Sequence, residues 1–216
     1  MDCCHCQAIE ERFNRKRAAD RLRDYQKDGL KRESQLLVDA LVEQGIDGYS
    51  LLDVGGGMGA LTIELIKRGI KQATINEAST AYLETAASEA QRQGLADQIE
   101  FIHGNIVTTA TKIPSADVVT LDKVVCCYDD MPGLVRATLG KAGRLYGLVY
   151  PRDNLLVKAG FRYENLVSWL RGSDFRVFVY PTRAVDGLIR QNGFQMRARR
   201  TRGQWQIVVY GRAKSA

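Results

Sequence analysis

The chain has 216 residues, of which 45% are hydrophobic and 26% are charged, and its formal net charge at pH 7 is +6. A chain of this length and composition can bury an ample core as a single α/β domain with a small cap. No apolar run approaches the ~18 residues of a membrane span, and the charged start lacks the apolar segment of a signal peptide, so we expect a soluble, cytoplasmic protein.

Two helices are predicted before the first strand. Apolar residues recur at near-helical spacing over 9–25, and this helix is expected to end at Gly29. A second apolar group at 36–41 marks another helix, which ends at Gly45. We therefore expect residues 1–48 to form a helical cap or lid.

The most informative feature follows the first predicted strand. The apolar run at 50–52 leads directly into a glycine-rich turn, Asp53-Val54-Gly55-Gly56-Gly57-Met58-Gly59. Glycine tolerates positive φ and has no Cβ, so the backbone N–H groups of such a turn can approach a nucleotide-like ligand. The turn predicts a site for a nucleotide-containing cofactor.

The charge near this turn distinguishes between two cofactors. Gly55, Gly57 and Ala60 satisfy the dinucleotide pattern G-x-G-x-x-G/A, and Glu77 follows at about the distance where an acid takes a ribose hydroxyl pair. A carboxylate at Asp53, however, would repel a diphosphate and favour the ammonium and sulfonium of S-adenosylmethionine. The charge favours S-adenosylmethionine, and an NAD(P)-binding oxidoreductase stays open as the alternative.

The rest of the chain alternates between short β-rich runs and helical stretches. Strands are predicted near 50–55, 72–77, 98–103, 116–121 and 144–150, with helices near 60–68, 79–93 and 130–141. This alternation implies parallel pairing with right-handed crossovers, and hence a doubly wound sheet. A last helix after Pro181 precedes a terminal strand pair at 195–200 and 204–210.

The turn at 53–59 has an acid, x, Gly, x, Gly, x, Gly in order, and it resembles the first motif of class I S-adenosylmethionine-dependent methyltransferases. The segments 75–79, 101–106 and 116–122 resemble the ends of the family's second, third and fourth strands, so the likeness covers nearly all of the chain. The family more often has Asp where Asn105 stands, but an Asn oxygen can also accept from an adenine amino group.

The resemblance implies an α/β, Rossmann-like, seven-stranded sheet in the order 3-2-1-4-5-7-6 with the last strand antiparallel. The catalytic domain would span 49–216. Within the class, Phe13-Asn14 and the stretch from Tyr25 to Ser34 are similar to magnesium-protoporphyrin O-methyltransferases and their uncharacterised relatives. We transfer no substrate from this narrower likeness.

The resemblance also implies where the cofactor lies, across the carboxyl ends of the strands. The glycines would approach its methionine portion, Glu77 the ribose, and Asn105 and Ile106 the adenine. Leu121 would offer its backbone carbonyl to the methionine amino group. The expected cofactor-binding residues are Asp53, Gly55, Gly57, Gly59, Glu77, Ala78, Asn105, Ile106 and Leu121, with Tyr25 and Ser34 if the leading helices close over the site.

Methyl transfer from a sulfonium needs little side-chain chemistry. Holding the nucleophile and the methyl group at ~3 Å in a dry site can supply roughly 7 to 11 kcal/mol. A general base is needed only for a hydroxyl, an acidic carbon or a protonated amine. Asp122 and Tyr128, which follow the fourth predicted strand, are the candidates for that role.

Residues 151–180 are predicted to form an acceptor-binding insertion. Aromatic and apolar residues recur there at helical spacing, which fits either acceptor binding or ordinary core packing. We expect a small, apolar or aromatic methyl acceptor. The candidate acceptor contacts are Cys126, Cys127, Tyr150, Arg152 and Trp169.

Five cysteines stand in two clusters, at 3–6 and 126–127. Their odd number does not suit a secreted disulfide framework, so we predict reduced thiols and no metal, with a soft metal or metalloid between the clusters as the alternative. A basic run at 197–202 keeps an RNA methyltransferase open, although the motif of base-amine methyltransferases is missing after the fourth strand. A non-catalytic cofactor-binding protein also stays open, and we expect a monomer or a homodimer.

Overall fold

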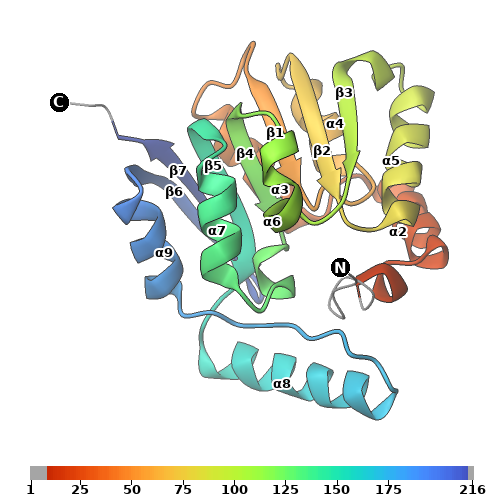
Figure 1. The fold of residues 1–216 in the computed structure, drawn as a ribbon, viewed down its shortest axis with the longest axis vertical. Helices are drawn as coiled ribbons and strands as arrows, with labels where there is room; N and C mark the ends of the chain where they lie inside the picture. Colours follow the sequence, from red (N-terminus) through yellow and green to blue (C-terminus); the bar gives the residue numbers. More distant parts are fainter. Residues whose placement is uncertain (1–8, 214–216) are drawn as a thin grey trace.

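The computed structural model describes residues 9–213 and contains one seven-stranded sheet with helices on both faces (Figure 1). The strand order is β3-β2-β1-β4-β5-β7-β6. The strands are β1 (Ser50–Val54), β2 (Gln72–Glu77), β3 (Ile99–His103), β4 (Ala116–Asp122), β5 (Ala142–Pro151), β6 (Phe194–Arg202) and β7 (Trp205–Arg212). Because β7 is antiparallel to both β5 and β6, the predicted order and direction of the strands are confirmed.

The helices in chain order are α2 (Arg15–Asp28), α3 (Arg32–Val42), α4 (Ala60–Ile66), α5 (Thr80–Arg92), α6 (Ile106–Thr109), α7 (Met131–Leu139), α8 (Leu155–Leu170) and α9 (Thr182–Gln191). The turn after β4 contains the short 3₁₀ helix η3 (Val125–Cys127). Within the described residues, no helix is both long and apolar enough to cross a lipid bilayer.

Side chains alternate between the two faces of the central strands, as the period of a β-strand requires. Leu51 of β1 belongs to one core cluster, together with side chains of α2 to α5. Leu52 belongs to the other cluster, together with side chains of α6, α7 and α9. The central strands are therefore buried on both faces, which explains their continuous apolar runs.

The first predicted helix is interrupted at Phe13 and Asn14. The Asn14 side chain accepts a hydrogen bond from the backbone N–H of Arg17 at 3.2 Å, and α2 therefore begins at Arg15. An Asn side chain that caps a helix start competes with continuation of the preceding helix. The apolar spacing across 9–25 had suggested a continuous helix, which is wrong.

The second predicted helix, α3, packs directly on the sheet. Leu37 and Leu41 are fully buried in the same core cluster as Val149 of β5 and Val209 of β7. Gly147 of β5 leaves room for this contact, since a Cβ there would lie 2.9 Å from Leu37 Cδ1. The chain before residue 48 thus contributes to the main core.

Helix α8 differs from the other helices in its position. It lies beyond the end of the sheet toward which β2 and β3 point, and the segment 171–181 returns from it to α9 (Figure 1). Phe161 is the only residue of α8 that is fully buried, and its ring lies 6.1 Å from that of Trp205. This placement puts α8 beside the ends of the strands where a ligand is expected.

Candidate cofactor and acceptor site

A cavity of about 510 Å³ opens at the carboxyl ends of β1, β2 and β4. The strand order reverses between β1 and β4, and such a switch point is where open α/β sheets bind their ligands. The turn after β1 forms its floor, α2 and α3 form one wall, and Trp205 at the start of β7 forms another. The cavity therefore joins segments from both ends of the described chain.

The glycines of the turn are each required for a different structural reason. Gly55 has φ +63°, and a Cβ there would lie 2.6 Å from Val124 Cγ2. Gly57 has φ +59°, and its N–H donates to Glu77 Oε2 at 2.9 Å. Both line the cavity, and their contact with a cofactor stays a prediction. Gly59 does not line it: a Cβ at Gly59 would meet Ala86 at 3.2 Å, so this glycine serves the packing of α4.

Asp53 lies in the floor of the cavity but is almost fully buried, with 1% of its surface exposed. Its Oδ2 accepts from Thr62 Oγ1 at 2.8 Å, and its Oδ1 accepts from Thr120 Oγ1 at 2.7 Å. Burial raises the pKa of this carboxyl to about 7, against the opposing effect of the two hydroxyl donors. A cation bound in the cavity would favour the ionised form.

Glu77 ends β2 and faces the same cavity. Its Oε1 accepts from the Ser79 N–H at 2.8 Å, while its Oε2 takes the Gly57 N–H. Burial raises the pKa of this carboxyl. Each oxygen keeps a second lone pair, so Glu77 can also accept from the hydroxyl groups of a ligand. Ala78, the next residue, also lines the cavity.

The residues predicted to contact adenine do not line the cavity. The Asn105 side chain caps α6, where its Oδ1 accepts from the Val107 N–H at 3.0 Å and from the Tyr128 hydroxyl at 2.7 Å. Ile106 is buried in the core, and so is Leu121 of β4. Gly104 lines this side of the cavity instead, with its carbonyl held by the Asn76 amide at 2.9 Å.

An ion-paired cluster follows β4, and the sequence reasoning missed its centre, Lys123. The Lys123 Nζ lies 3.0 Å from Ser34 Oγ, 3.2 Å from Asp122 Oδ1 and 3.3 Å from Glu33 Oε1. Ser34 also donates a short hydrogen bond to Asp122 Oδ2. All four residues line the cavity. A Lys directly after a strand that ends in an acid was the available signal.

This geometry changes the expected roles of three residues. Asp122 Oδ2 accepts from the Ser34 hydroxyl, and its Oδ1 lies 3.2 Å from Lys123 Nζ but has no hydrogen-bond partner. Asp122 is thus a member of the ion-paired cluster, and its role as a general base stays a prediction. Ser34 reaches the cavity from α3, as predicted, but its hydroxyl bonds Asp122. Tyr25 lines the cavity from α2, while its hydroxyl donates to Glu64 Oε1 at 2.8 Å.

The two thiols after β4 occupy different positions. Cys127 lines the cavity, and Cys126 is buried behind it with its Sγ 4.0 Å from that of Cys127. The hydrogen bond between the thiols, with burial, raises the pKa of Cys126. The cysteines at 3, 4 and 6 lie outside the described residues. Within residues 9–213, no group of three or more His, Cys, Asp or Glu side chains is arranged to hold a metal.

The other candidate acceptor contacts are not among the residues that line the cavity. Tyr150 is buried within the sheet, and burial raises the pKa of its phenol. Arg152 is exposed and donates to the Gly203 carbonyl at 3.3 Å, while Trp169 projects from α8 with 61% of its surface exposed. Tyr128 does line the cavity, and its hydroxyl donates to Asn105.

Apolar and aromatic side chains other than the predicted ones form one wall of the cavity, here called the apolar wall. Phe13, Leu30 and Trp205 line the cavity together with Tyr82. The ring of Phe13 packs edge-on against Tyr82 and against Phe175, with both centroid distances at 5.6 Å. Phe13 and Trp205 come from near the two ends of the chain and Tyr82 comes from α5, so no local sequence spacing connects these side chains.

The basic run at 197–202 lies on the edge strand β6 and is partly paired within the protein. Arg200 forms an ion pair with Glu43, and Arg199 donates to Gln206 Oε1 at 3.0 Å. These contacts give part of the run a structural role.

Residues 51–140 match the family of methyltransferase domains. A curated relative, the release factor glutamine methyltransferase of Gloeobacter violaceus, is 28% identical over 118 residues, which cover 47% of this chain and 41% of that protein. The chain therefore spans less than half the length of that relative.

Two solved structures show how far the likeness of fold extends. Magnesium protoporphyrin IX methyltransferase from Synechocystis PCC 6803 with bound SAH superimposes with a TM-score of 0.72 at 19% identity, covering 95% of this chain and 98% of that one. An O-methyltransferase family protein from Burkholderia thailandensis gives a TM-score of 0.69 at 20% identity, covering 94% of this chain and 64% of that one.

These matches and the geometry of the turn agree with the predicted class, a methyltransferase that uses S-adenosylmethionine. Residues 51–140 match the methyltransferase domain family, and the whole chain shares its fold with the solved structure of magnesium protoporphyrin IX methyltransferase.

Proposed function

We propose that this protein transfers a methyl group from S-adenosylmethionine to a small apolar or aromatic molecule. The observation that carries the proposal is that one cavity holds both the glycine turn with Glu77 and an apolar wall that includes Phe13 and Trp205. The first part suits a nucleoside with a charged amino acid portion, and the second suits an apolar acceptor.

In this proposal the cofactor occupies the floor of the cavity. Glu77 accepts from the ribose hydroxyl groups while its other lone pairs keep the Gly57 and Ser79 N–H groups in place. Asp53 and the cluster of Glu33, Asp122 and Lys123 supply more negative than positive charge around the site. That balance favours the sulfonium and ammonium groups of the cofactor over a diphosphate.

Catalysis in this proposal rests on positioning and exclusion of water. The apolar wall would hold the acceptor atom in line with the methyl group, and a proximity effect of this kind can contribute roughly 7 to 11 kcal/mol. Tyr128 lines the cavity, and its hydroxyl oxygen would accept a hydrogen bond from a hydroxyl acceptor and orient it, while its own proton is donated to Asn105. Asp122 would instead hold Lys123 and Ser34 in position.

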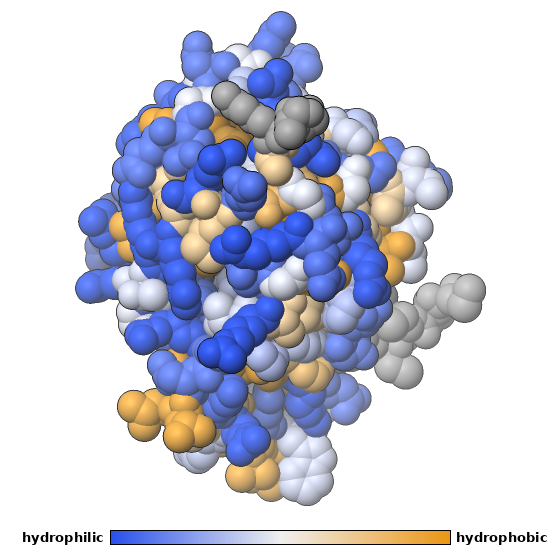
Figure 2. Space-filling model, turned by 90° about the vertical axis from the view of Figure 1, so that its left-hand side faces the viewer, coloured by the Kyte–Doolittle hydropathy of each residue, from blue (hydrophilic) through white to orange (hydrophobic). Residues whose placement is uncertain are grey.

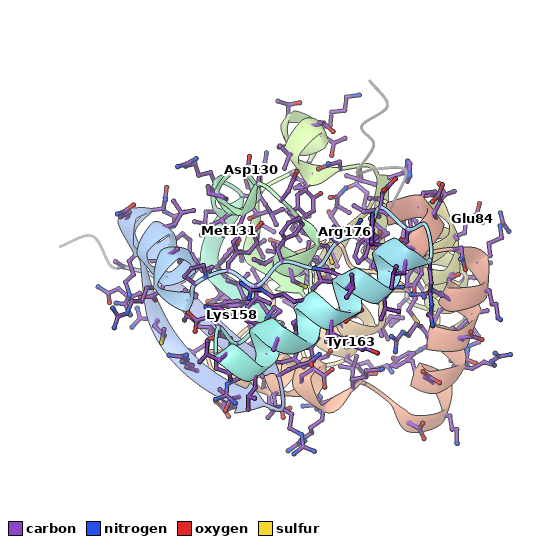
Figure 3. The ribbon with its side chains drawn as sticks, turned by 90° about the horizontal axis from the view of Figure 1, so that it is seen from below. Glu84, Asp130, Met131, Lys158, Tyr163 and Arg176 are labelled. Carbon is purple, nitrogen blue, oxygen red and sulfur yellow. The ribbon has the colours of Figure 1, made fainter. Side chains whose placement is uncertain are left out.

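Calorimetry with S-adenosylmethionine, S-adenosylhomocysteine and NAD tests the proposal. We expect the first two to bind and NAD not to bind. Glu77→Gln should weaken binding of both adenosyl ligands by about tenfold or more, since a charged acceptor of two hydroxyl groups is replaced by a neutral amide. The matched control is Glu84→Gln on α5, whose carboxylate pairs with Arg15 at the surface (Figure 3).

The control variant should bind like the wild-type protein. Binding of NAD without binding of S-adenosylmethionine would refute the assignment. Binding of S-adenosylmethionine without turnover on any acceptor would leave a non-catalytic cofactor-binding protein as the correct description.

A further inference from the structure

Helix α8 presents an apolar face that no other part of the described chain covers. Among the large apolar side chains exposed in residues 9–213, all but Val107 lie on this helix. They are between 52% and 86% exposed, and they are Leu155, Leu156, Tyr163, Leu166, Trp169 and Leu170. A concentration of this kind on one element marks an interaction surface more often than chance exposure.

The exposed side chains form one stripe along the helix. Leu155, Ala159, Tyr163, Leu166 and Leu170 are spaced by four, four, three and four residues, which places them on a single face of an α-helix. Figure 2 shows hydrophobic atoms protruding along the lower edge of a mostly hydrophilic face, where α8 lies. In Figure 3, which looks onto this end of the molecule, α8 crosses in front of the strand ends.

The opposite face of α8 is fixed to the body of the protein. Phe161 packs on Trp205, and Glu164 pairs with Arg12 at 3.3 Å. Asn165 holds the backbone of Val177 by two hydrogen bonds of 2.8 Å each. These contacts fix the rotation of α8 about its own axis, and the apolar stripe faces solvent because it lies on the side without such contacts.

Charge around the stripe indicates what covers it. Between residues 155 and 176 there are four basic side chains and two acidic ones, and one acid, Glu164, is already paired. Arg162 and Arg171 are exposed and make no ion pair within the described chain. Arg162, four residues before Leu166, stands on the same face as the stripe, and Arg171 follows the end of the helix. An exposed apolar stripe of Leu, Tyr and Trp with basic side chains on and beside it is typical of a helix that lies in the surface of an anionic membrane.

A second copy of the chain fits this surface less well. A helix of 16 residues is about 24 Å long and about 10 Å wide, so its face covers on the order of 240 Å². A stable protein interface needs about 800 Å² from each partner. Pairing two such helices would also bring their basic flanks together.

We propose that α8 docks in the plane of an anionic lipid surface, with Leu155, Tyr163, Leu166 and Leu170 inserted among the acyl chains and Arg162 and Arg171 at the headgroups. Apolar burial and attraction to anionic lipid would then act together. The proposal does not depend on the identity of the methyl acceptor or on catalysis.

Co-sedimentation of the full chain with vesicles tests this docking. One set contains phosphatidylcholine alone, and the other contains phosphatidylcholine mixed with phosphatidylglycerol. We expect the wild-type protein to bind the anionic vesicles more tightly, and salt to weaken that binding. Leu166→Glu with Leu170→Glu should reduce it roughly tenfold or more, because two apolar side chains are removed and two negative charges are added.

Two further variants test whether vesicle binding is specific to α8 and how much its arginines contribute. Val107→Glu, at the exposed apolar residue of α6, should bind vesicles like the wild-type protein. Arg162→Gln with Arg171→Gln should lose the preference for anionic vesicles. Circular dichroism and calorimetry with S-adenosylmethionine show whether each variant is folded, and they report on the proposed function independently of vesicle binding.

Three results would overturn the proposal. They are the absence of binding to either vesicle, equal binding by the α8 leucine variant, and equal binding to both kinds of vesicle. A dimer of the wild-type protein that disappears in the leucine variant, measured by light scattering, would assign the stripe to a second copy instead.

Discussion

Asp53 shows how a single buried carboxyl can shape the turn and respond to its ligand. Thr62 and Thr120 donate to its two oxygens and tie β1 to α4 and β4. Because its pKa is raised to about 7, an appreciable fraction is protonated at neutral pH in the free protein. Ionised Asp53 therefore lowers stability, and a bound cation would offset part of that effect.

Asp53→Asn should remove a pH dependence of folding. The folded pKa of about 7 lies above the ordinary Asp value, so the wild-type free energy of unfolding should fall as pH rises between these two values and level off above 7. Between pH 5 and 7.5 the variant should escape a loss of roughly 2–3 kcal/mol. Urea denaturation of both proteins at several pH values measures this difference, and parallel profiles would contradict it.

Gly55→Ala should damage both the fold and cofactor binding. The substitution places an L-residue at φ +63° and a methyl group 2.6 Å from Val124 Cγ2. We expect a loss of about 2–4 kcal/mol, of which the φ term is about 1 kcal/mol. Gly45→Ala is the control, because Gly45 has φ +77° and no atom near the added Cβ. If thermal unfolding shows equal losses, the contact with Val124 is unimportant.

At the level of elements, α3 connects the leading helices to the sheet. Its buried leucines pack on β5 and β7, and Glu33 and Ser34 from its first turn join the cluster around Lys123. The same helix thus contributes to the hydrophobic core and to the wall of the cavity. Loss of its packing should affect both.

Leu37→Ala tests whether α3 belongs to the cooperative core. Leu37 is fully buried, so its truncation should cost about 2–5 kcal/mol and lower the midpoint of a single unfolding transition. Leu156→Ala makes the same chemical change at a side chain that is 86% exposed, and it should change stability by less than about 0.5 kcal/mol. A separate early transition in the Leu37 variant would instead indicate an independent cap.

The elements that the sequence predicted best are those with strong local signals. The apolar runs of β4 and β5 between helical stretches led to the correct strands, since both faces of these strands are covered. The break at Asn14 was missed because its capping bond opposes the apolar spacing on either side. The helical spacing of the apolar residues at 161–170 predicted one shared face, but the structure buries Phe161 and exposes Tyr163, Leu166, Trp169 and Leu170. Spacing alone does not tell which side of a helix points outward.

In the candidate site, too, local sequence patterns predict some residues and do not reveal those that only tertiary packing brings together. Gly55, Gly57 and Glu77 line one cavity because strand ends in a doubly wound sheet converge at one edge, and their contacts with the cofactor stay predictions. Asn105 does not line the cavity, because its side chain caps the short helix α6, and its contact with adenine stays a prediction. Phe13 and Trp205 were not found, since tertiary packing alone brings them together.

At the scale of the whole molecule, the residues that line the cavity come partly from within 51–140 and partly from outside this stretch. Residues that match the methyltransferase family, 51–140, provide the glycine turn and Glu77, whereas Phe13 and Trp205 lie outside that stretch. The part of the site with a recognisable sequence pattern is therefore the part proposed to hold the cofactor. The part proposed to hold the acceptor has no pattern of its own.

This division has an evolutionary consequence. Substitutions near either end of the chain can remodel the pocket wall without changing the residues that are proposed to bind the methyl donor. Proteins that share the central stretch can therefore diverge in the second substrate that they accept, because that part of the pocket wall is supplied from outside it.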